Sequence, residues 1–239
     1  MKKIFLGAPG SGKGTAASKI APKRNVPHIS TGDLFRENIN KKTPIGAKAK
    51  EYIEKGELAP DEIVIEMLKK RIQQEDCQNG FILDGFPRTI SQAEKLSKLT
   101  NIDLVINISV PKEIIIQRLS SRITCKECGK IFNAIYHKPK NESKCDQCHG
   151  EIIRRPDDKP EIIQNRLKIY EEQTAPLIEF YKSKGILQNI LCDDINKPAD
   201  ETAQLIINSI KEFSNKISQI ILPSNLSSLA SSSCSSKSH

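Results

Sequence analysis

The sequence predicts an α/β fold in which helices cover both faces of a doubly wound parallel sheet. Four short apolar runs have the length of buried strands, and they lie at residues 3–8, 80–86, 103–110 and 185–191. Longer segments with helical spacing of apolar residues separate them, as at 60–74 and 160–183. Strands that alternate with helices favour a parallel sheet, and right-handed crossovers place the loops after the strands along one edge.

Length, composition and charge narrow the class of protein. The chain has 239 residues, of which 37 % are hydrophobic and 28 % charged, as is typical of a soluble globular protein with one sizeable core. No apolar run approaches the roughly 20 residues that span a membrane, and no secretory signal is recognisable. We therefore expect a cytoplasmic protein without a membrane partner. The net charge of +8 favours an anionic ligand.

Three regions depart from the alternation of strands and helices. Residues 30–59 are polar and largely helical in pattern, and residues 122–159 contain four of the seven cysteines. Both are interpreted as inserts over the ligand-binding edge. Residues 223–239 are rich in serine and too poor in apolar side chains to pack, so we expect them to be disordered.

The stretch GAPGSGKGT, Gly7 to Thr15, follows the first apolar run and precedes a helical run at 15–23. Glycines let the backbone curl so that several N–H groups point inward, and Lys13 adds a positive charge. Gly14 stands where a phosphate-binding loop usually has Ser or Thr. A glycine-rich turn without a ligand is the alternative, but the strand and helix on either side favour a phosphate-binding loop (P-loop).

Two further motifs carry polar residues at strand ends. In ILDGFPRT, Asp84 ends a strand and could orient water on Mg²⁺ bound to phosphates; capping of the next turn is the alternative. Arg88 follows a proline, and its guanidinium group could donate two hydrogen bonds to one phosphate. In STGDLFR, Thr31 could simply cap a helix whose first turn contains Asp33.

Two Cys-x-x-Cys pairs, Cys125/Cys128 and Cys145/Cys148, have the spacing of a metal site. Four thiolates around Zn²⁺ leave no open position for water, so this zinc would be structural rather than catalytic. A zinc ribbon that binds nucleic acid is the alternative. Against it, residues 122–159 contain no convincing recognition helix.

Taken together, these motifs resemble the adenylate kinase family, in the long bacterial form whose LID carries zinc cysteines. The matching stretches are GAPGSGKGT, STGDLFR, GELAPDE, LDGFPRTISQAE, RRPDD and QTAPLIEFY. The match is colinear from residue 3 to about residue 212. The resemblance implies transfer of a phosphoryl group from ATP to AMP with Mg²⁺, giving two ADP.

The resemblance also implies a division of the chain into parts. A CORE of residues 1–29, 60–121 and 160–213 would be a P-loop doubly wound parallel sheet of five strands. Residues 30–59 would form a helical AMP-binding insert, and residues 122–159 a zinc-ribbon-like LID. Residues 214–239 would be a disordered tail.

By the same resemblance, individual residues receive roles. Those expected at ATP are Gly10, Ser11, Gly12, Lys13, Gly14, Thr15, Arg118, Arg122, Ile131, Phe132 and Lys197, with Arg118 and Phe132 flanking the adenine. Those expected at AMP are Thr31, Arg36, Glu57, Leu58, Ala59, Gly85, Phe86, Pro87, Arg88, Gln92, Arg155 and Arg166. The catalytic set is Lys13, Asp84, Arg88, Arg122, Arg155 and Arg166. Gln92 would read the adenine, because an amide can donate and accept at once.

Some positions and roles stay open at this level. Ser121-Arg122-Ile123 replaces the usual Gly-Arg-Arg of the family, and the segment at 193–200 also departs from its pattern. Asp157 and Asp158 would either orient arginines or cap the helix that begins near Pro160. Another nucleoside monophosphate kinase, acting on UMP, CMP or GMP, is the nearest alternative function. We expect a monomer that does not bind nucleic acid.

Overall fold

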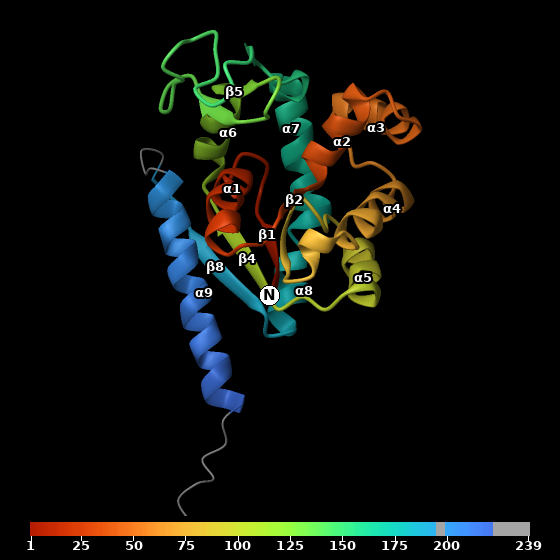
Figure 1. The fold of residues 1–239 in the computed structure, drawn as a ribbon, viewed down its shortest axis with the longest axis vertical. Helices are drawn as coiled ribbons and strands as arrows, with labels where there is room; N and C mark the ends of the chain where they lie inside the picture. Colours follow the sequence, from red (N-terminus) through yellow and green to blue (C-terminus); the bar gives the residue numbers. More distant parts are fainter. Residues whose placement is uncertain (195–198, 222–239) are drawn as a thin grey trace, which may run out of the picture.

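A five-stranded parallel sheet forms the centre of the molecule (Figure 1). The computed structural model describes residues 1–194 and 199–221. The strands are β1 (Lys2–Leu6), β2 (His28–Ser30), β3 (Phe81–Asp84), β4 (Leu104–Ser109) and β8 (Leu187–Leu191). Their order is β2-β3-β1-β4-β8, and each neighbouring pair runs parallel. Because β1 lies between β3 and β4, the chain changes direction of winding beside it, and such a switch point is where ligands bind in open α/β sheets.

The four strands expected from apolar runs are present, and the fifth, β2, is the one those runs did not indicate. It has only three residues, of which Ile29 alone is apolar and buried. Neither the alternation of apolar and polar residues nor the β-propensity of three residues can identify so short an edge strand. Its pairing with β3 fixes it instead, and that pairing involves a residue more than fifty positions away.

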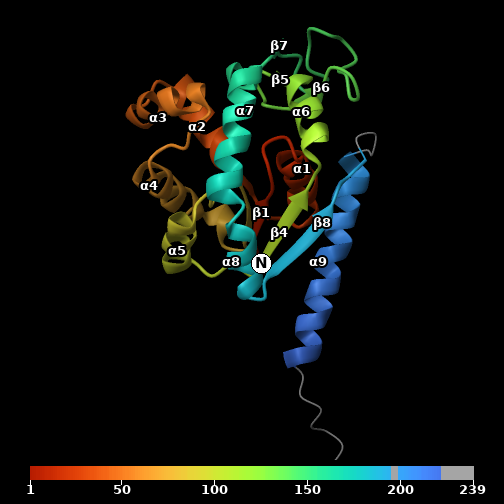
Figure 2. The same ribbon diagram turned by 180° about the vertical axis from the view of Figure 1, so that it is seen from behind.

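Both faces of the sheet are covered by helices. Ile4 and Leu6 of β1 point to one face and Phe5 to the other, as the two-residue period of a strand requires. The helices α1 (Lys13–Lys23) and α9 (Ala199–Ile221) pack on the Phe5 face. On the opposite face lie α4 (Asp61–Ile72), α5 (Ile90–Leu99) and α8 (Leu177–Ser183), as Figure 2 shows.

The segment expected as one helical stretch at 160–183 is divided. It forms α7 (Pro160–Ile169), a π-helical turn η3 (Tyr170–Thr174) and α8. Pro176 lacks the backbone N–H that would continue the helix, which accounts for the break. The helix α6 (Lys112–Ser120) packs beside α7 through Ile115, Leu119 and Leu167.

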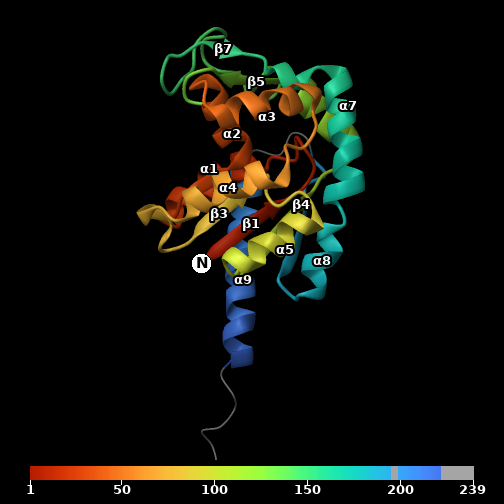
Figure 3. The same cartoon turned by 90° about the vertical axis from the view of Figure 1, so that its right-hand side faces the viewer.

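Two inserts stand at the carboxyl end of the strands, away from the N-terminus (Figure 3). Residues 30–59 contain α2 (Thr31–Asn40) and α3 (Pro44–Lys55). Residues 122–159, called the LID below, form an antiparallel sheet of β5 (Arg122–Cys125), β6 (Ile131–Asn133) and β7 (Ile152–Ile153) in the order β6-β5-β7. No α-helix lies anywhere in this insert, all of which the structure describes; it holds only the 3-10 turn η2 (Pro156–Asp158). A second such turn, η1 (Glu75–Cys77), precedes β3.

The C-terminal helix is longer than expected. α9 continues to Ile221, so the prediction that the chain is disordered from residue 214 was wrong for residues 214–221. This segment, SNKISQII, contains only two serines, and the serine-rich composition begins further on. The serine-rich tail at 223–239 and Lys197 lie outside the described residues. Among the described helices, none combines the length and the apolar character that a membrane crossing needs.

Candidate active site

The loop between β1 and α1 lies at the switch point of the sheet. Gly7 approaches the neighbouring strand so closely that a Cβ there would be 2.5 Å from the carbonyl oxygen of Ile108. Gly12 immediately precedes α1 with a φ of 96°, a conformation that favours glycine. These two glycines allow the loop to curl around the N-terminus of α1, where backbone N–H groups are free to bind an anion.

Lys13 is folded back onto this loop. Its Nζ donates to the carbonyl oxygens of Gly7 and Ala8, each at 2.8 Å. The pKa of Lys13 is lowered to about 8, mainly by burial; Asp84 opposes this shift, and the nearby charges of Arg88, Arg166 and Arg122 add to it. A phosphate in the loop would reverse this situation, because an adjacent anion favours the charged form of lysine.

Five arginines form a group that includes the neighbours of Lys13: Arg88, Arg122 and Arg166 act on Lys13 itself, and Arg36 and Arg155 lie beside these arginines. Their mutual influence shows the proximity: the pKa of Arg155 is lowered to about 9, first by burial and then by Arg36 and Arg122. The pKa of Arg88 is lowered to about 10 by burial and then by Arg166. Arg88 and Arg155 remain protonated at neutral pH. Partly buried cations crowded in this way form a site for a polyanion.

Two carboxylates, Asp157 and Asp158, hold two of these cations, Arg122 and Arg166, in place. Asp158 accepts from Nε of Arg122 at 2.7 Å and from its Nη2, and from Nη1 of Arg166 at 3.3 Å. Asp157 accepts from Nη1 of Arg166 at 2.8 Å. Burial would raise the pKa of Asp157, but the surrounding arginines, Arg166 first, outweigh it and lower the pKa. The helix α7 has no side-chain cap, so orientation of arginines is the role the structure gives this pair.

The residues expected around AMP line a cavity of about 70 Å³. Its lining consists of Thr31, Gly32, Phe35, Arg36, Ile53, Gly56, Glu57, Leu58, Ala59, Val64, Gly85, Arg88, Gln92, Asp157 and Arg166. Of the remaining residues in that set, Phe86 is buried in the core, Pro87 precedes Arg88, and Arg155 lies near Arg36 and Asp33. The cavity lies between the insert of α2 and α3 and the loop after β3.

The loop after β3 is held by side chains that the sequence did not identify. The hydroxyl of Thr174, in the π-helical turn, donates to the carbonyl oxygen of Arg88 at 2.8 Å. Nε of Arg88 in turn donates to the carbonyl oxygen of Gly85, also at 2.8 Å. Thr174 lies in a recognised motif, QTAPLIEFY, but only its hydrogen bond gives it a role. His28, whose Nε2 is 3.3 Å from Oδ2 of Asp84, could not be foreseen because β2 was not.

The start of α2 excludes the alternative that Thr31 caps this helix. Ser30, not Thr31, is the N-cap, and its hydroxyl accepts from the backbone N–H of Asp33 at 3.2 Å. Thr31 is free of the capping role and donates to the carbonyl oxygen of Gly85 at 2.9 Å. Arg36 is paired with Asp33. The helix therefore carries both of its expected AMP residues toward the loop after β3.

Among the residues expected at ATP, Arg118 contacts the P-loop through Nη1, which donates to the carbonyl oxygen of Ser11 at 3.4 Å. Ile131 of the LID reaches over Gly14, with its Cδ1 3.9 Å from where a Cβ would stand. The ring of Phe132 is 2 % exposed and stacks on His137 inside the LID. Contact of Phe132 with adenine stays a prediction, and this burial does not favour stacking by its ring.

Asp84 occupies the position from which a carboxylate can serve a metal-bound nucleotide. It ends β3, is 9 % exposed, and its Oδ2 would be 3.1 Å from a Cβ on Gly14. Mg²⁺ that accompanies nucleotide phosphates prefers such oxygen ligands or water oriented by them. The residues present therefore fit magnesium brought in with the nucleotide.

Comparison with known proteins identifies the family. The model of the family described as "Adenylate kinase" matches residues 5–186. This chain belongs to the adenylate kinase family. The adenylate kinase of Caldicellulosiruptor saccharolyticus is 54 % identical over 192 residues, covering 78 % of this chain and 89 % of that protein. The adenylate kinase of Acetivibrio thermocellus is 49 % identical over 215 residues, covering 88 % and 98 % respectively.

An archaeal relative is equally similar. The adenylate kinase of Archaeoglobus fulgidus is 50 % identical over 195 residues, which cover 80 % of this chain and 90 % of that protein. Adenylate kinases are phosphotransferases, so the chain is an enzyme of that class. The P-loop and the arginine cluster described above are the parts that phosphoryl transfer needs.

Four of the seven cysteines of this chain form one cluster in the LID. The four Sγ atoms of Cys125, Cys128, Cys145 and Cys148 lie within 4.8 Å of one another. The Cys125–Cys148 and Cys128–Cys145 sulfur pairs are 3.4 and 3.6 Å apart. Four sulfurs about 2.3 Å from a tetrahedral Zn²⁺ would be separated by about 3.8 Å. The donor set and its spacing therefore fit zinc with all four positions filled by protein.

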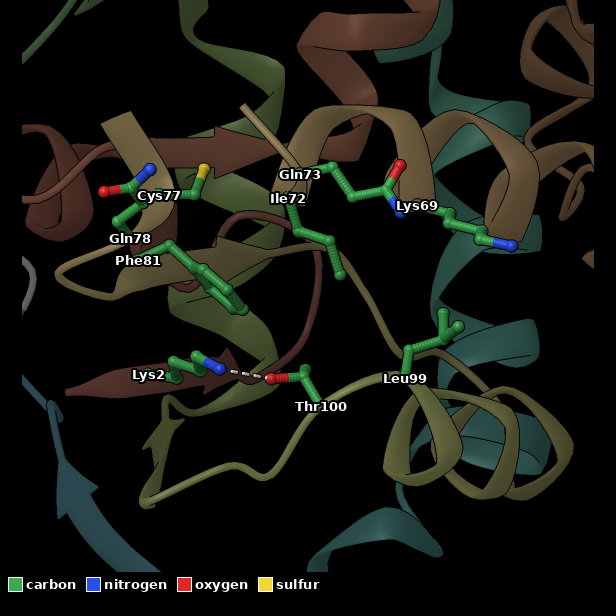
Figure 4. A pocket seen from close by; sticks show the side chains of 9 residues that line it. All are labelled: Lys2, Lys69, Ile72, Gln73, Cys77, Gln78, Phe81, Leu99 and Thr100. Carbon is green, nitrogen blue, oxygen red and sulfur yellow. Dashed lines mark hydrogen bonds between the residues drawn. The ribbon is translucent and has the colours of Figure 1, made fainter. Parts of the chain in front are cut away.

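A larger cavity, of about 240 Å³, lies at the amino ends of the strands, opposite the end that carries the P-loop (Figure 4). Its lining consists of Lys2, Lys69, Ile72, Gln73, Cys77, Gln78, Phe81, Leu99 and Thr100. It opens where β1 and β3 begin, whereas the P-loop follows the end of β1. The Lys2 ammonium donates to the Thr100 hydroxyl at 2.6 Å. This cavity is not the candidate active site despite its larger volume, because the arginines and the phosphate-binding loop lie at the carboxyl ends of the strands.

Proposed function

We propose that this chain catalyses the reversible transfer of the terminal phosphoryl group of MgATP to AMP, giving two ADP. The observation that carries the proposal is the grouping of Lys13 with Arg88, Arg122 and Arg166 after the end of β1, with Arg36 and Arg155 beside these arginines. Phosphoryl transfer needs little covalent help from a protein. It needs two polyphosphates held in line and their charge screened, and a cluster of partly buried cations would supply both.

The two nucleotides would enter from opposite sides of the cluster. Residues Gly10 to Thr15 would hold the ATP phosphates on the backbone N–H groups of the loop, with Lys13 reaching toward the transferred group. Arg36 and Arg88, which line the smaller cavity, would bind the phosphate of AMP. Mg²⁺ would arrive with ATP, and its part is to offset the charge of the phosphate oxygens.

The LID and the AMP-binding insert would then close the site. Arg122 and Arg155 belong to the LID, and Arg166 to α7 of the CORE, so closure brings cations from both sides around the reacting group. Water excluded in this way cannot take the phosphoryl group in place of AMP. We include in the proposal the CORE, insert and LID boundaries given above.

The zinc cluster would serve this movement without chemistry of its own. Four cysteine ligands leave no position for water or substrate, so the proposed Zn²⁺ is structural. It would fix the turns at both ends of the LID sheet and thereby the strand that carries Arg122. A cytoplasmic monomer with no nucleic-acid partner completes the proposal, on the strength of the family resemblance.

The nearest alternative is a kinase for UMP, CMP or GMP. The cavity lining favours AMP, because Gln92 and the segment 57–59 are both in it. A zinc ribbon that binds nucleic acid is less well supported, since the LID contains no α-helix to enter a groove.

Lys13→Ala tests the proposal in an assay that measures diphosphate formation from ATP with AMP, UMP, CMP and GMP as acceptors. We expect the wild type to prefer AMP and the variant to lose about a thousandfold in kcat. Lys23→Ala, at the exposed end of α1, is the matched control and should retain activity. Normal turnover by the Lys13 variant, or a preference for another acceptor, would contradict the proposal.

A further inference from the structure

The side-chain amide of Gln92 is held on both sides by protein groups. Its Oε1 accepts from the backbone N–H of Arg88 at 2.8 Å. Its Nε2 donates to Oδ1 of Asp61 at 2.7 Å. Gln92 is 2 % exposed, yet it lines the cavity expected to hold AMP. The amide is therefore both buried and directed by its neighbours.

These two partners permit only one orientation of the amide. A backbone N–H can only donate and a carboxylate can only accept, so a flipped amide would place NH₂ against N–H and oxygen against carboxylate. Leaving buried polar groups opposed in this way costs more than the hydrogen bonds gain. One lone pair of Oε1 and one hydrogen of Nε2 remain for a ligand.

Asp61 is itself fixed. It is the first residue of α4, and its second oxygen, Oδ2, accepts from the hydroxyl of Ser91 at 2.9 Å. The Lys95 ammonium lies 3.5 Å from the same oxygen. Helices α4 and α5, neighbours in Figure 1, are thus joined at their first turns. The oxygen that faces Gln92 has no freedom to turn away.

We propose that Asp61 is a specificity-determining positioning residue, which fixes the Gln92 amide so that the acceptor site takes the base edge of AMP and rejects that of IMP. The inference rests on the proposed function and extends it to a residue that does not line the cavity itself. Asp61 acts through Gln92 and need not touch the nucleotide.

The chemistry of the two bases makes the consequence sharp. Adenine offers an amino donor at position 6 and an acceptor at N1, which pair with the remaining acceptor and donor of a fixed amide. Hypoxanthine offers an acceptor at position 6 and a donor at N1, the reverse pattern in the same shape. A freely rotating amide would pair with either base by flipping. A site with fixed buried polar groups rejects the base that leaves them unpaired.

Steady-state kinetics with AMP and IMP as acceptors tests the inference. Asp61→Asn keeps the shape but lets the side chain present either a donor or an acceptor, and Asp61→Ala removes the partner. In both variants we expect the ratio of kcat/KM for AMP over IMP to fall by about tenfold or more. The KM for AMP should rise while kcat with AMP changes little, because Asp61 is remote from the phosphates.

The control variants separate positioning from a loss of structure. Ser91→Ala removes a hydrogen bond to the same carboxylate but leaves the bond from Gln92, so its AMP/IMP ratio should stay at the wild-type value. In a Gln92→Ala background, Asp61→Ala should change the ratio no further. Thermal melting of each variant shows whether the fold is retained.

Several results would overturn the inference. An unchanged AMP/IMP ratio in folded Asp61 variants would do so, as would a further change of the ratio in the Gln92→Ala background. Either result would leave the proposed function intact if the wild type still forms ADP from ATP and AMP. A wild type that does not phosphorylate AMP would overturn the proposed function and this inference with it.

Discussion

At the scale of single residues, Lys13 shows how the site is prepared for an anion. Its ammonium group is buried and surrounded by other cations, and its only hydrogen-bond partners among the described residues belong to the P-loop itself. The loop carbonyls hold the side chain in place, but they do not neutralise it. A bound phosphate would do so, which makes binding of a nucleotide and protonation of Lys13 linked events.

This linkage gives a prediction with a definite sign. The pKa of Lys13 in the free protein is about 8, lowered mainly by burial, and an adjacent phosphate should raise it. Above that pH, binding must take up a proton, so affinity for ATP should fall as the pH rises through about 8. Below it Lys13 is already protonated and contributes no uptake. Calorimetry at about pH 8.5 in buffers of different ionisation enthalpy measures the uptake.

The matched control for this measurement is Lys13→Met. It removes the titrating group while leaving the other cations of the cluster in place. Proton uptake at the same pH should decrease in this variant. Equal uptake by the wild type and the variant would mean that another group titrates on binding.

The sequence predicted residues with strong local signals and missed those whose roles depend on distant partners. Lys13, Asp84 and the four cysteines lie in short motifs whose residue types and spacing indicate their chemical role directly. Thr174 and Asp61 also lie in recognised stretches, but their partners, Arg88 and Gln92, are far along the chain. The alternative that Thr31 caps α2 was wrong by one residue, because a cap is decided by where the helix begins, which a sequence locates only to within a residue or two.

At the scale of elements, the LID depends on very little apolar core. Phe132, Cys125 and Cys145 are its fully buried apolar residues, with Ile123 and Ile152 packed against them. Ile123, which stands where the family usually has an arginine, therefore has a packing role. So small an apolar core seldom stabilises a fold by itself. A bound metal ion can supply the missing stability.

We predict that removal of the proposed zinc loosens the LID but leaves the phosphoryl transfer reaction. Cys145→Ser removes one of the four proposed zinc ligands and should lower the zinc content. The melting temperature should fall as well, because a metal that binds only the folded protein adds to its stability. Substantial activity should remain at low temperature, because no ligand takes part in the reaction. Calorimetric melting and metal analysis on the same samples test this.

Cys77→Ser is the control, because Cys77 lies outside the cluster at the far edge of the sheet. The Cys77→Ser variant should have the same zinc content as the wild type, even if the substitution changes the melting temperature. Complete loss of activity in a Cys145 variant that is folded and saturates with both nucleotides would contradict a structural role for the metal.

Elements with a clear period were predicted well, and those defined by their surroundings were not. The strands with long apolar runs and the helices of the 30–59 insert follow from local pattern. The edge strand β2 is too short to show one, and the break between α7 and α8 comes from a single proline and a π-helical turn. The extension of α9 was missed because the serine-rich composition further along the chain was assigned to the whole tail.

At the scale of the whole molecule, one carboxylate joins two of its parts. Asp158 binds Arg122, which begins the first strand of the LID, and Arg166, which belongs to α7 of the CORE. Its side chain is only 4 % exposed, so the three charges interact with little screening by water. The connection between LID and CORE is therefore electrostatic as well as covalent.

We predict that Asp158→Asn weakens this connection. It leaves two buried arginines without their shared carboxylate, which should cost about 3 kcal/mol in the free energy of unfolding. The KM for ATP should also rise, since Arg122 would no longer be held toward the P-loop. Chemical denaturation and steady-state kinetics test the two effects.

Glu151→Gln provides the comparison. It removes an ion pair with Lys126 on the surface of the LID, where both side chains are exposed. Surface pairs contribute little, so both quantities should stay near the wild-type values. An equal response of the two variants would show that the burial of Asp158 has no special importance.

The order of strands in the sheet has a consequence for the newly made chain. Strands β1 to β4 are all complete by residue 109, but the free edge of β4 is covered only by β8, at residues 187–191. A ribosome must therefore make the LID and α7 before that edge can be paired. Until then β4 presents open N–H and C=O groups, the kind of edge that invites pairing with another chain. The interval between these two strands is where the nascent polypeptide would benefit most from a chaperone.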